Sequence, residues 1–221
     1  QIYLRAMDSQ AARPLSGTEG AVSPFFSPDG QWIGFFAGSK LKTISINGGA
    51  AITLADAVNP RGASWSRQGI IAYSPTNSGP LQRISDGGGT SQALTRLGKG
   101  DNNHRWPEFL PGDTAVLFAN GTIATPGVLV QALGAGEPRS LAPGSNPHYT
   151  PSGHLIYGQD GSLMAAPFDL QKLALTGTAI PVVEDVLQST ANGFAQYSIS
   201  ATGSLAYISG GVHAEQRKIA W

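Results

Sequence analysis

The chain has 221 residues and carries 14 basic and 14 acidic side chains, so its formal net charge is zero. Only 13% of the residues are charged, and there are 29 glycines, 15 prolines and no cysteine. The neutral charge offers no basic surface for nucleic acid, and the lack of cysteine excludes disulfides and thiolate metal sites. The sequence contains no run of 18 apolar residues, so it predicts no membrane span and no membrane contact by this segment, and its length suits a single domain.

Residues 23–57 are predicted to form four short strands joined by tight turns. The turn at 27–30, Ser-Pro-Asp-Gly, combines the fixed φ of proline with two residues that accept a tight backbone. The run at 32–36 is short, apolar and aromatic, which is typical of a strand buried on both faces. Asn-Gly-Gly at 47–49 then predicts a hairpin into a last, outermost strand at 51–54.

The same pattern recurs along the chain, with each turn preceded by a large apolar residue and followed by an apolar strand. The five turns occupy residues 27–30, 66–69, 110–113, 150–153 and 200–203, and their last positions are 39, 44, 40 and 50 residues apart. A repeat of roughly 40–45 residues with four strands is the signature of a propeller blade. The sequence therefore predicts an all-β chain, a β-propeller of four-stranded antiparallel blades.

The repeats divide residues 1–221 into one domain of about five blades. Full blades are expected at 21–57, 60–97, 104–142 and 146–187, and a closing blade shared by the two termini at 193–209 plus 2–15. Sharing this blade would leave no open sheet edge. The segment 216–221 resembles a further strand that would compete with residues 2–7. Either it is spare, or the chain is an open segment of a larger propeller, in which case two chains could form a homodimer through open blade edges.

The Ser-Pro-Asp-Gly turn and its flanking residues resemble the repeats of TolB-like and WD-repeat-like β-propellers. Residues 103–113 and 216–221 resemble the propeller domains of bacterial membrane-anchored serine/threonine protein kinases, and the fold also resembles the propeller of prolyl-oligopeptidase-type enzymes. The resemblance covers the whole chain and implies a sensor or interaction domain outside the cytoplasm, in the periplasm or at the cell surface. It also implies a longer protein, because the chain begins inside a predicted strand. The positions that depart from the Asp-Gly order of the turn are Gln68, Gly112, Asp113, Ser152 and Thr202.

The segments that lead into the first strand of each blade supply the candidate site. In propellers these segments lie at one mouth of the central channel, where ligands commonly bind. Aligned on the following aromatic residue, Asn59 matches Asn103 and Arg61 matches Arg105. Arginine offers a rigid fork of donors, so the expected partner is a protein, a peptide or a small anionic ligand. The candidate residues are Asn59, Arg61, Asn103, His104, Arg105, Trp106, His148 and Gln196.

The same residues also have structural interpretations. Asparagine is an ordinary turn residue, and the two arginines could instead pair with Glu108 or Asp101. Trp106 is expected to pack between blades rather than to stack on a ligand, and His104 fits either role.

No catalytic motif is present. Residues 62–66 match only half of a G-x-S-x-G elbow and lie on a predicted strand. The four histidines lack the spacing of a metal site, so neither a metal nor a cofactor is expected. The sequence therefore favours a non-catalytic ligand- or protein-binding propeller, and the alternative is a hydrolase or lyase that uses polar residues at the channel mouth.

Overall fold

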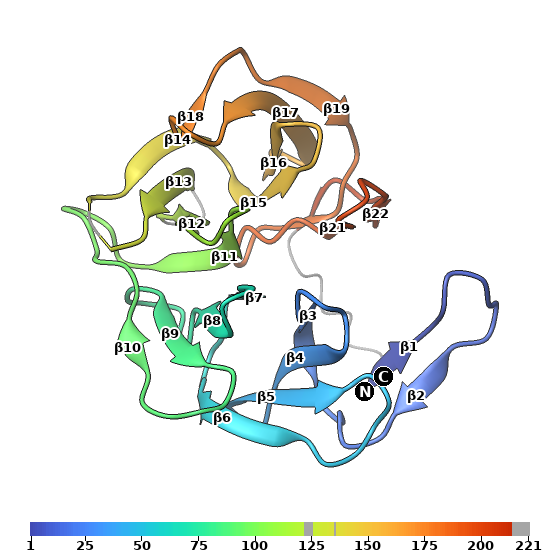
Figure 1. Cartoon of the computed structure of the whole chain (residues 1–221). Coiled ribbons are helices and arrows are strands. Elements are labelled where there is room, and N and C mark those ends of the chain that lie inside the picture. The colour runs from blue at the N-terminus through green and yellow to red at the C-terminus, as the bar shows by residue number, and fades with distance from the viewer. Residues whose placement is uncertain (122–125, 135, 214–221) are drawn as a thin grey trace, which may run out of the picture.

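The computed structural model describes residues 1–121, 126–134 and 136–213, and every regular element in these ranges is a β-strand. Four sheets contain four or five strands each, paired antiparallel and mostly in sequence order, and they are arranged like blades in an arc (Figure 1). The predicted all-β propeller of four-stranded antiparallel blades is therefore confirmed. The expected strand at 216–221 lies outside the described residues. No helix in the described ranges is long and apolar enough to cross a membrane.

The first blade shows how local sequence produces the unit. It consists of β3 (Val22–Phe26), β4 (Trp32–Ala37), β5 (Lys40–Ser45) and β6 (Ile52–Asp56). In the turn after β3, the carbonyl of Ser27 accepts a hydrogen bond from Gly30 at 2.9 Å. The hydroxyl of Ser27 accepts another from the backbone N–H of Trp32, also at 2.9 Å. Residues 33–37 of β4 are all buried, which explains their apolar run.

Three further blades follow the same plan. The second consists of β7 (Ala63–Trp65), β8 (Ile70–Tyr73), β9 (Gln82–Ser85) and β10 (Gln92–Ala93); the third of β11 (His104–Phe109), β12 (Ala115–Asn120), β13 (Gly127–Ala132) and β14 (Arg139–Pro143); and the fourth of β15 (Ser145–Thr150), β16 (His154–Gln159), β17 (Ser162–Asp169), β18 (Ala174–Leu175) and β19 (Ile180–Val183). The core lies between blades. Leu117 of the third blade, for example, belongs to one buried cluster with Leu155, Tyr157 and Phe168 of the fourth.

The terminal strands form two separate hairpins, which corrects the expected closing blade. At one end β1 (Ile2–Leu4) pairs with β2 (Arg13–Leu15), and at the other β21 (Tyr197–Ile199) pairs with β22 (Leu205–Tyr207). The short β20 (Gln188–Ser189) and β23 (Val212–His213) pair in parallel. Among the described residues no pairing joins the two hairpins into one sheet. The alternative expectation, an open segment of a larger propeller, fits this arrangement.

Each terminal hairpin stays apart because it packs on a different blade. Leu15 of the first hairpin is buried against Phe35 of the first blade. Tyr197 of the second hairpin is buried against Ile156 of the fourth blade. After β22 the backbone turns back, and the carbonyls of residues 208 and 211 accept hydrogen bonds from residues 187 and 188.

Candidate ligand-binding site

A backbone irregularity near the start of the first strand of each blade shapes the site. These first strands, β3, β7, β11 and β15, contact one another and are called the inner strands below. Three residues before the aromatic residue of each inner strand, the backbone has a positive φ, at Ser23 (47°), Gly62 (85°), Trp106 (54°) and Asn146 (53°). In β3, β11 and β15 a proline follows and the pairing register shifts there. A register shift of this kind is a β-bulge, and it changes the direction in which the neighbouring side chains point.

Arg105 directly precedes the bulge of β11 and is held by neutral acceptors. Its Nε donates to Asn103 Oδ1 at 2.7 Å, its Nη1 to the carbonyl of Asn192 at 2.9 Å and its Nη2 to the carbonyl of Gly121 at 2.6 Å. Burial lowers the pKa of Arg105, and the positive charge of Arg61 lowers it further. The backbone N–H of Trp106, the residue after Arg105, donates to the carbonyl of Arg61 at 2.8 Å, so the two arginines lie in adjoining segments.

Arg61 occupies the matching position in the second blade. Its Nη1 donates to Asn59 Oδ1 at 2.6 Å and to the carbonyl of Pro60 at 2.8 Å, and burial lowers its pKa. Asn59 and Asn103 thus perform the same task, since each accepts a hydrogen bond from the arginine two residues later. In each copy of the repeated Asn-x-Arg sequence, the asparagine side chain orients the guanidinium group of the arginine.

Within the described ranges neither arginine forms an ion pair. The alternative that they link to Glu108 or Asp101 is wrong, because both acids are engaged elsewhere. Glu108 forms an ion pair with His148, and Asp101 accepts from the backbone of Gly98 and from the side chain of Asn120. Partly desolvated charges without a counter-charge are costly. A bound anion would offset that cost.

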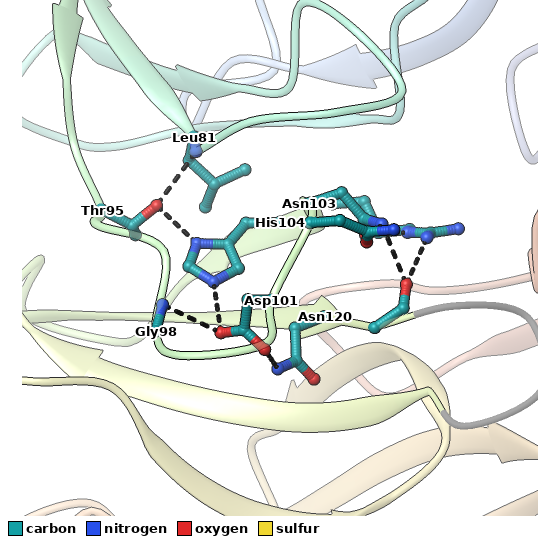
Figure 2. Close-up of polar contacts among 10 residues, drawn as sticks. Leu81, Thr95, Gly98, Asp101, Asn103, His104 and Asn120 are labelled. Atoms are coloured by element: carbon teal, nitrogen blue, oxygen red, sulfur yellow. Dashed lines mark hydrogen bonds and ion pairs between the residues drawn. The ribbon is translucent and has the colours of Figure 1, made fainter.

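His104 has a structural role (Figure 2). Its side chain is fully buried, with Nδ1 2.8 Å from Thr95 Oγ1 and Nε2 3.4 Å from Asp101 Oδ2. The ring also packs on Phe118, with the centroids 4.5 Å apart. Burial lowers the pKa of His104, and the neighbouring Asp101 opposes that shift. Of the two roles open to His104, the structure shows the link between blades.

Trp106 packs between blades as expected. Its ring lies 4.6 Å from that of Phe194, and a Cβ added to Gly62 would come within 2.8 Å of it. Trp106 is only 8% exposed and Asn146 only 5%. Yet Trp106 Nε1 and Asn146 Oδ1 are buried without a hydrogen-bond partner in the described structure. Buried polar groups normally have partners, so this donor and this acceptor are two unsatisfied groups in the packing between blades.

His148 is engaged with an acid rather than free for an anion. Besides its ion pair with Glu108, its ring meets that of Tyr197 edge-on at 5.1 Å. Burial lowers the pKa of His148, but the charge and hydrogen bond of Glu108 outweigh burial, so the pKa is raised above its ordinary value. Glu108 also accepts from the backbone N–H of Tyr149 at 2.7 Å. His148 therefore helps to hold β11 to β15.

The segment before β21 contacts Arg105 and the start of β15, but through residues that were not among the candidates. The carbonyl of Asn192 accepts from Arg105, and the hydroxyl of Ser145 donates to the carbonyl of Gly193. Gln196 is half-buried, and its backbone bonds to residues 187 and 208 at the terminal hairpin. Ser145 occupies the position of the two arginines when the blades are aligned on their aromatic residues, so the repeat itself could have identified it.

In the described ranges no three His, Cys, Asp or Glu side chains are grouped so as to hold a metal ion.

Comparison with known proteins supports the fold. No family model and no curated protein matches the sequence. Among solved structures, TolB from Acinetobacter baumannii is similar with a TM-score of 0.61 and 16% identity, over 82% of this chain and 49% of that one. A gluconolactonase from Xanthomonas campestris gives 0.64 and 14%, over 86% and 70%. The Swd1 propeller domain from Myceliophthora thermophila gives 0.60 and 11%, over 94% and 64%.

The chain has the β-propeller fold of these proteins. Its match spans about half of the TolB chain and less than two thirds of the Swd1 chain. These proteins share the architecture at low identity, so the likeness concerns the fold, and the functional argument depends on the site itself.

Proposed function

We propose that this propeller is a non-catalytic binding module that holds an anionic group at its arginine-bearing mouth. The group is a carboxylate or phosphate of a small molecule, a peptide or a protein. The observation that carries the proposal is that Arg61 and Arg105 lie in adjoining segments, joined by the hydrogen bond from the Trp106 N–H to the Arg61 carbonyl, with no described acidic side chain paired to either. A guanidinium fork matches such oxyanions in shape as well as charge.

The proposed setting follows from the sequence resemblance. We infer a sensor or interaction domain of a longer bacterial protein, anchored in the membrane elsewhere and carrying this propeller outside the cytoplasm, as in the kinases that residues 103–113 resemble. No cofactor is required for this role.

Calorimetric titration tests the anion site. The probes are inorganic phosphate and acetyl-dialanine with a free carboxylate, and acetyl-dialanine amide serves as the neutral counterpart. We expect the anions to bind and the amide not to bind. Arg61→Gln should weaken binding about tenfold or more, which corresponds to about 1.4 kcal/mol. The matched control is Arg83→Gln, which removes an exposed arginine of β9 that bonds to Gln92.

Stability measurements separate a binding role from a structural one. Arg61 donates only to the adjacent segment, so Arg61→Gln should leave the melting temperature nearly unchanged. A large drop in melting temperature with unchanged anion affinity would contradict the proposal. Turnover of esters, glycosides or lactones that disappears in His148→Gln would favour the hydrolase or lyase alternative instead.

A further inference from the structure

We propose a second binding site, for an organic cation, in a hollow between the first and second blades. The hollow has a volume of about 740 Å³, which lies within the usual range of small-molecule sites. Its lining includes Trp32, Trp65, Asp29 and Asp86. Trp65 is the last residue of β7, whereas Arg61 precedes its first residue. The two sites therefore lie at opposite ends of that strand.

The hollow is open because the outer strands of the second blade are short. β9 has four residues and β10 only two, whereas β5 of the first blade has six and β6 has five. The side of the first blade is consequently left partly uncovered. Ile52 of β6 lines the hollow and is 50% exposed.

Two indole rings give the hollow its aromatic surface. Trp32 is 36% exposed, while its backbone N–H is fixed by the hydroxyl of Ser27. Trp65 is held from two sides: its ring meets the Phe25 ring edge-on at 6.4 Å, and its Nε1 donates to Asp86 Oδ2 at 3.2 Å. Indole faces attract cations, and tryptophan does so more strongly than the other aromatic residues. A ligand therefore meets two indole groups, and the ring of Trp65 is already held in place.

Two carboxylates give the hollow its charge. A hydrogen bond from Ser27 and another from the backbone of Gln31 lower the pKa of Asp29, so this group is ionised at neutral pH. Both bonds go to Oδ1, and no hydrogen bond to Oδ2 is present among the described residues. Asp86 is the second acid. The basic residue among those that line the hollow is Arg67, which lies on an exposed turn and forms no ion pair among the described residues.

The indole rings and the carboxylates together determine the chemical class of the ligand. An anion would meet two carboxylates, and a purely apolar molecule would desolvate both without compensation. In the described ranges no cluster of His, Cys, Asp and Glu suits a bare metal ion. An ammonium or guanidinium group with an apolar body satisfies both the indole faces and the carboxylates. Such a group can belong to a free quaternary ammonium compound or to an arginine or lysine side chain.

Nuclear magnetic resonance of the indole N–H groups tests this inference directly. The probes are tetramethylammonium chloride and acetyl-arginine amide, with sodium chloride at equal ionic strength and acetyl-glutamine amide as controls. We expect the two cations to shift the resonances of Trp32 and Trp65 and to leave that of Trp106 unchanged. A preference for one probe identifies which source of cation the site takes. If neither cation shifts Trp32 or Trp65, or if the controls shift them equally, the proposal is wrong.

Matched variants locate the interaction. Trp32→Leu should weaken binding about fivefold or more, whereas Trp32→Phe keeps an aromatic face and should stay within about threefold of the wild type. Asp86→Asn keeps an acceptor for Trp65 Nε1 but loses the charge, so it should also weaken binding. Trp32 is partly exposed, and unchanged melting temperatures would verify that the variants fold. Equal affinity in Trp32→Leu and the wild type would overturn the assignment.

Discussion

At the scale of single residues, the direction of a side chain decides its role. His104 and Arg105 are neighbours in β11, and alternate residues of a strand point to opposite faces. His104 points into the space between blades, where Thr95 and Asp101 satisfy it. Arg105 points to the mouth, where only neutral acceptors hold it. The binding chemistry therefore lies with the arginine and not with the histidine beside it.

The pair formed by Glu108 and His148 makes a pH-dependent contribution to stability. The pKa of His148 is raised in the folded state above its ordinary value of about 6.5. The stabilisation is therefore fully present below about pH 6.5 and is lost as the pH rises through the folded pKa. Glu108→Gln keeps an acceptor for Tyr149 but removes the charge, so it should lower the pKa of His148 and abolish this loss of stability with rising pH.

A proton titration of His148 and denaturant unfolding at pH 6 and pH 9 check this expectation. His154, the half-buried first residue of β16, bonds to Ser152 and not to Glu108, so its resonance serves as the internal reference. A pKa of His148 that stays raised in Glu108→Gln would show that Glu108 is not the cause of the shift.

At the scale of the element, one glycine fixes the packing of the first blade. Gly34 of β4 is paired with Phe25 of β3, whose ring lies across it. A Cβ at this position would come within 2.1 Å of that ring. The aromatic ring thus fills the space that the missing side chain leaves, and the continuous apolar run of β4 depends on this gap.

We therefore expect Gly34→Ala to destabilise the fold by about 1–3 kcal/mol through overpacking. Unfolding in urea measures the loss. Gly87→Ala is the matched control, because a Cβ there meets its nearest neighbour at an ordinary 3.6 Å. In a Phe25→Leu background the cost of Gly34→Ala should fall, since contacting residues are energetically coupled. Equal costs in both backgrounds would mean that the ring is not the cause.

At the scale of the whole molecule, the arc of blades ends in open edges. β22 carries Leu205 at 40% and Tyr207 at 48% exposure, and its outer edge is unpaired among the described residues (Figure 1). The hairpin β21–β22 has the two inner strands of a blade, while β1–β2 has the two outer strands of another. Unpaired apolar edges are templates for association. We propose that they pair between two copies of the chain.

Light scattering tests this proposal. We expect the wild type to associate and Tyr207→Lys to be mainly monomeric, because a charge on an edge strand opposes pairing. Met7→Lys is the control, since Met7 is 90% exposed and outside the strands. A monomeric wild type would contradict association and would favour closure of the ring within one chain.

The sequence by itself determined the blade, because the forces that form its turns are local. The hydroxyls of Ser27, Ser66 and Ser200 each accept the N–H of a residue four or five positions later, which closes the turn from within. It also determined that the two arginines occupy equivalent positions, since the repeat aligns them.

The tertiary structure alone decided three further points. The terminal hairpins stay separate because each buries its apolar side on a different blade. The acids that could have neutralised the arginines pair with the two histidines instead, Asp101 with His104 and Glu108 with His148. The hollow beside Trp32 exists because the next blade is too short to cover it, and strand length in one blade is not encoded in the residues of its neighbour.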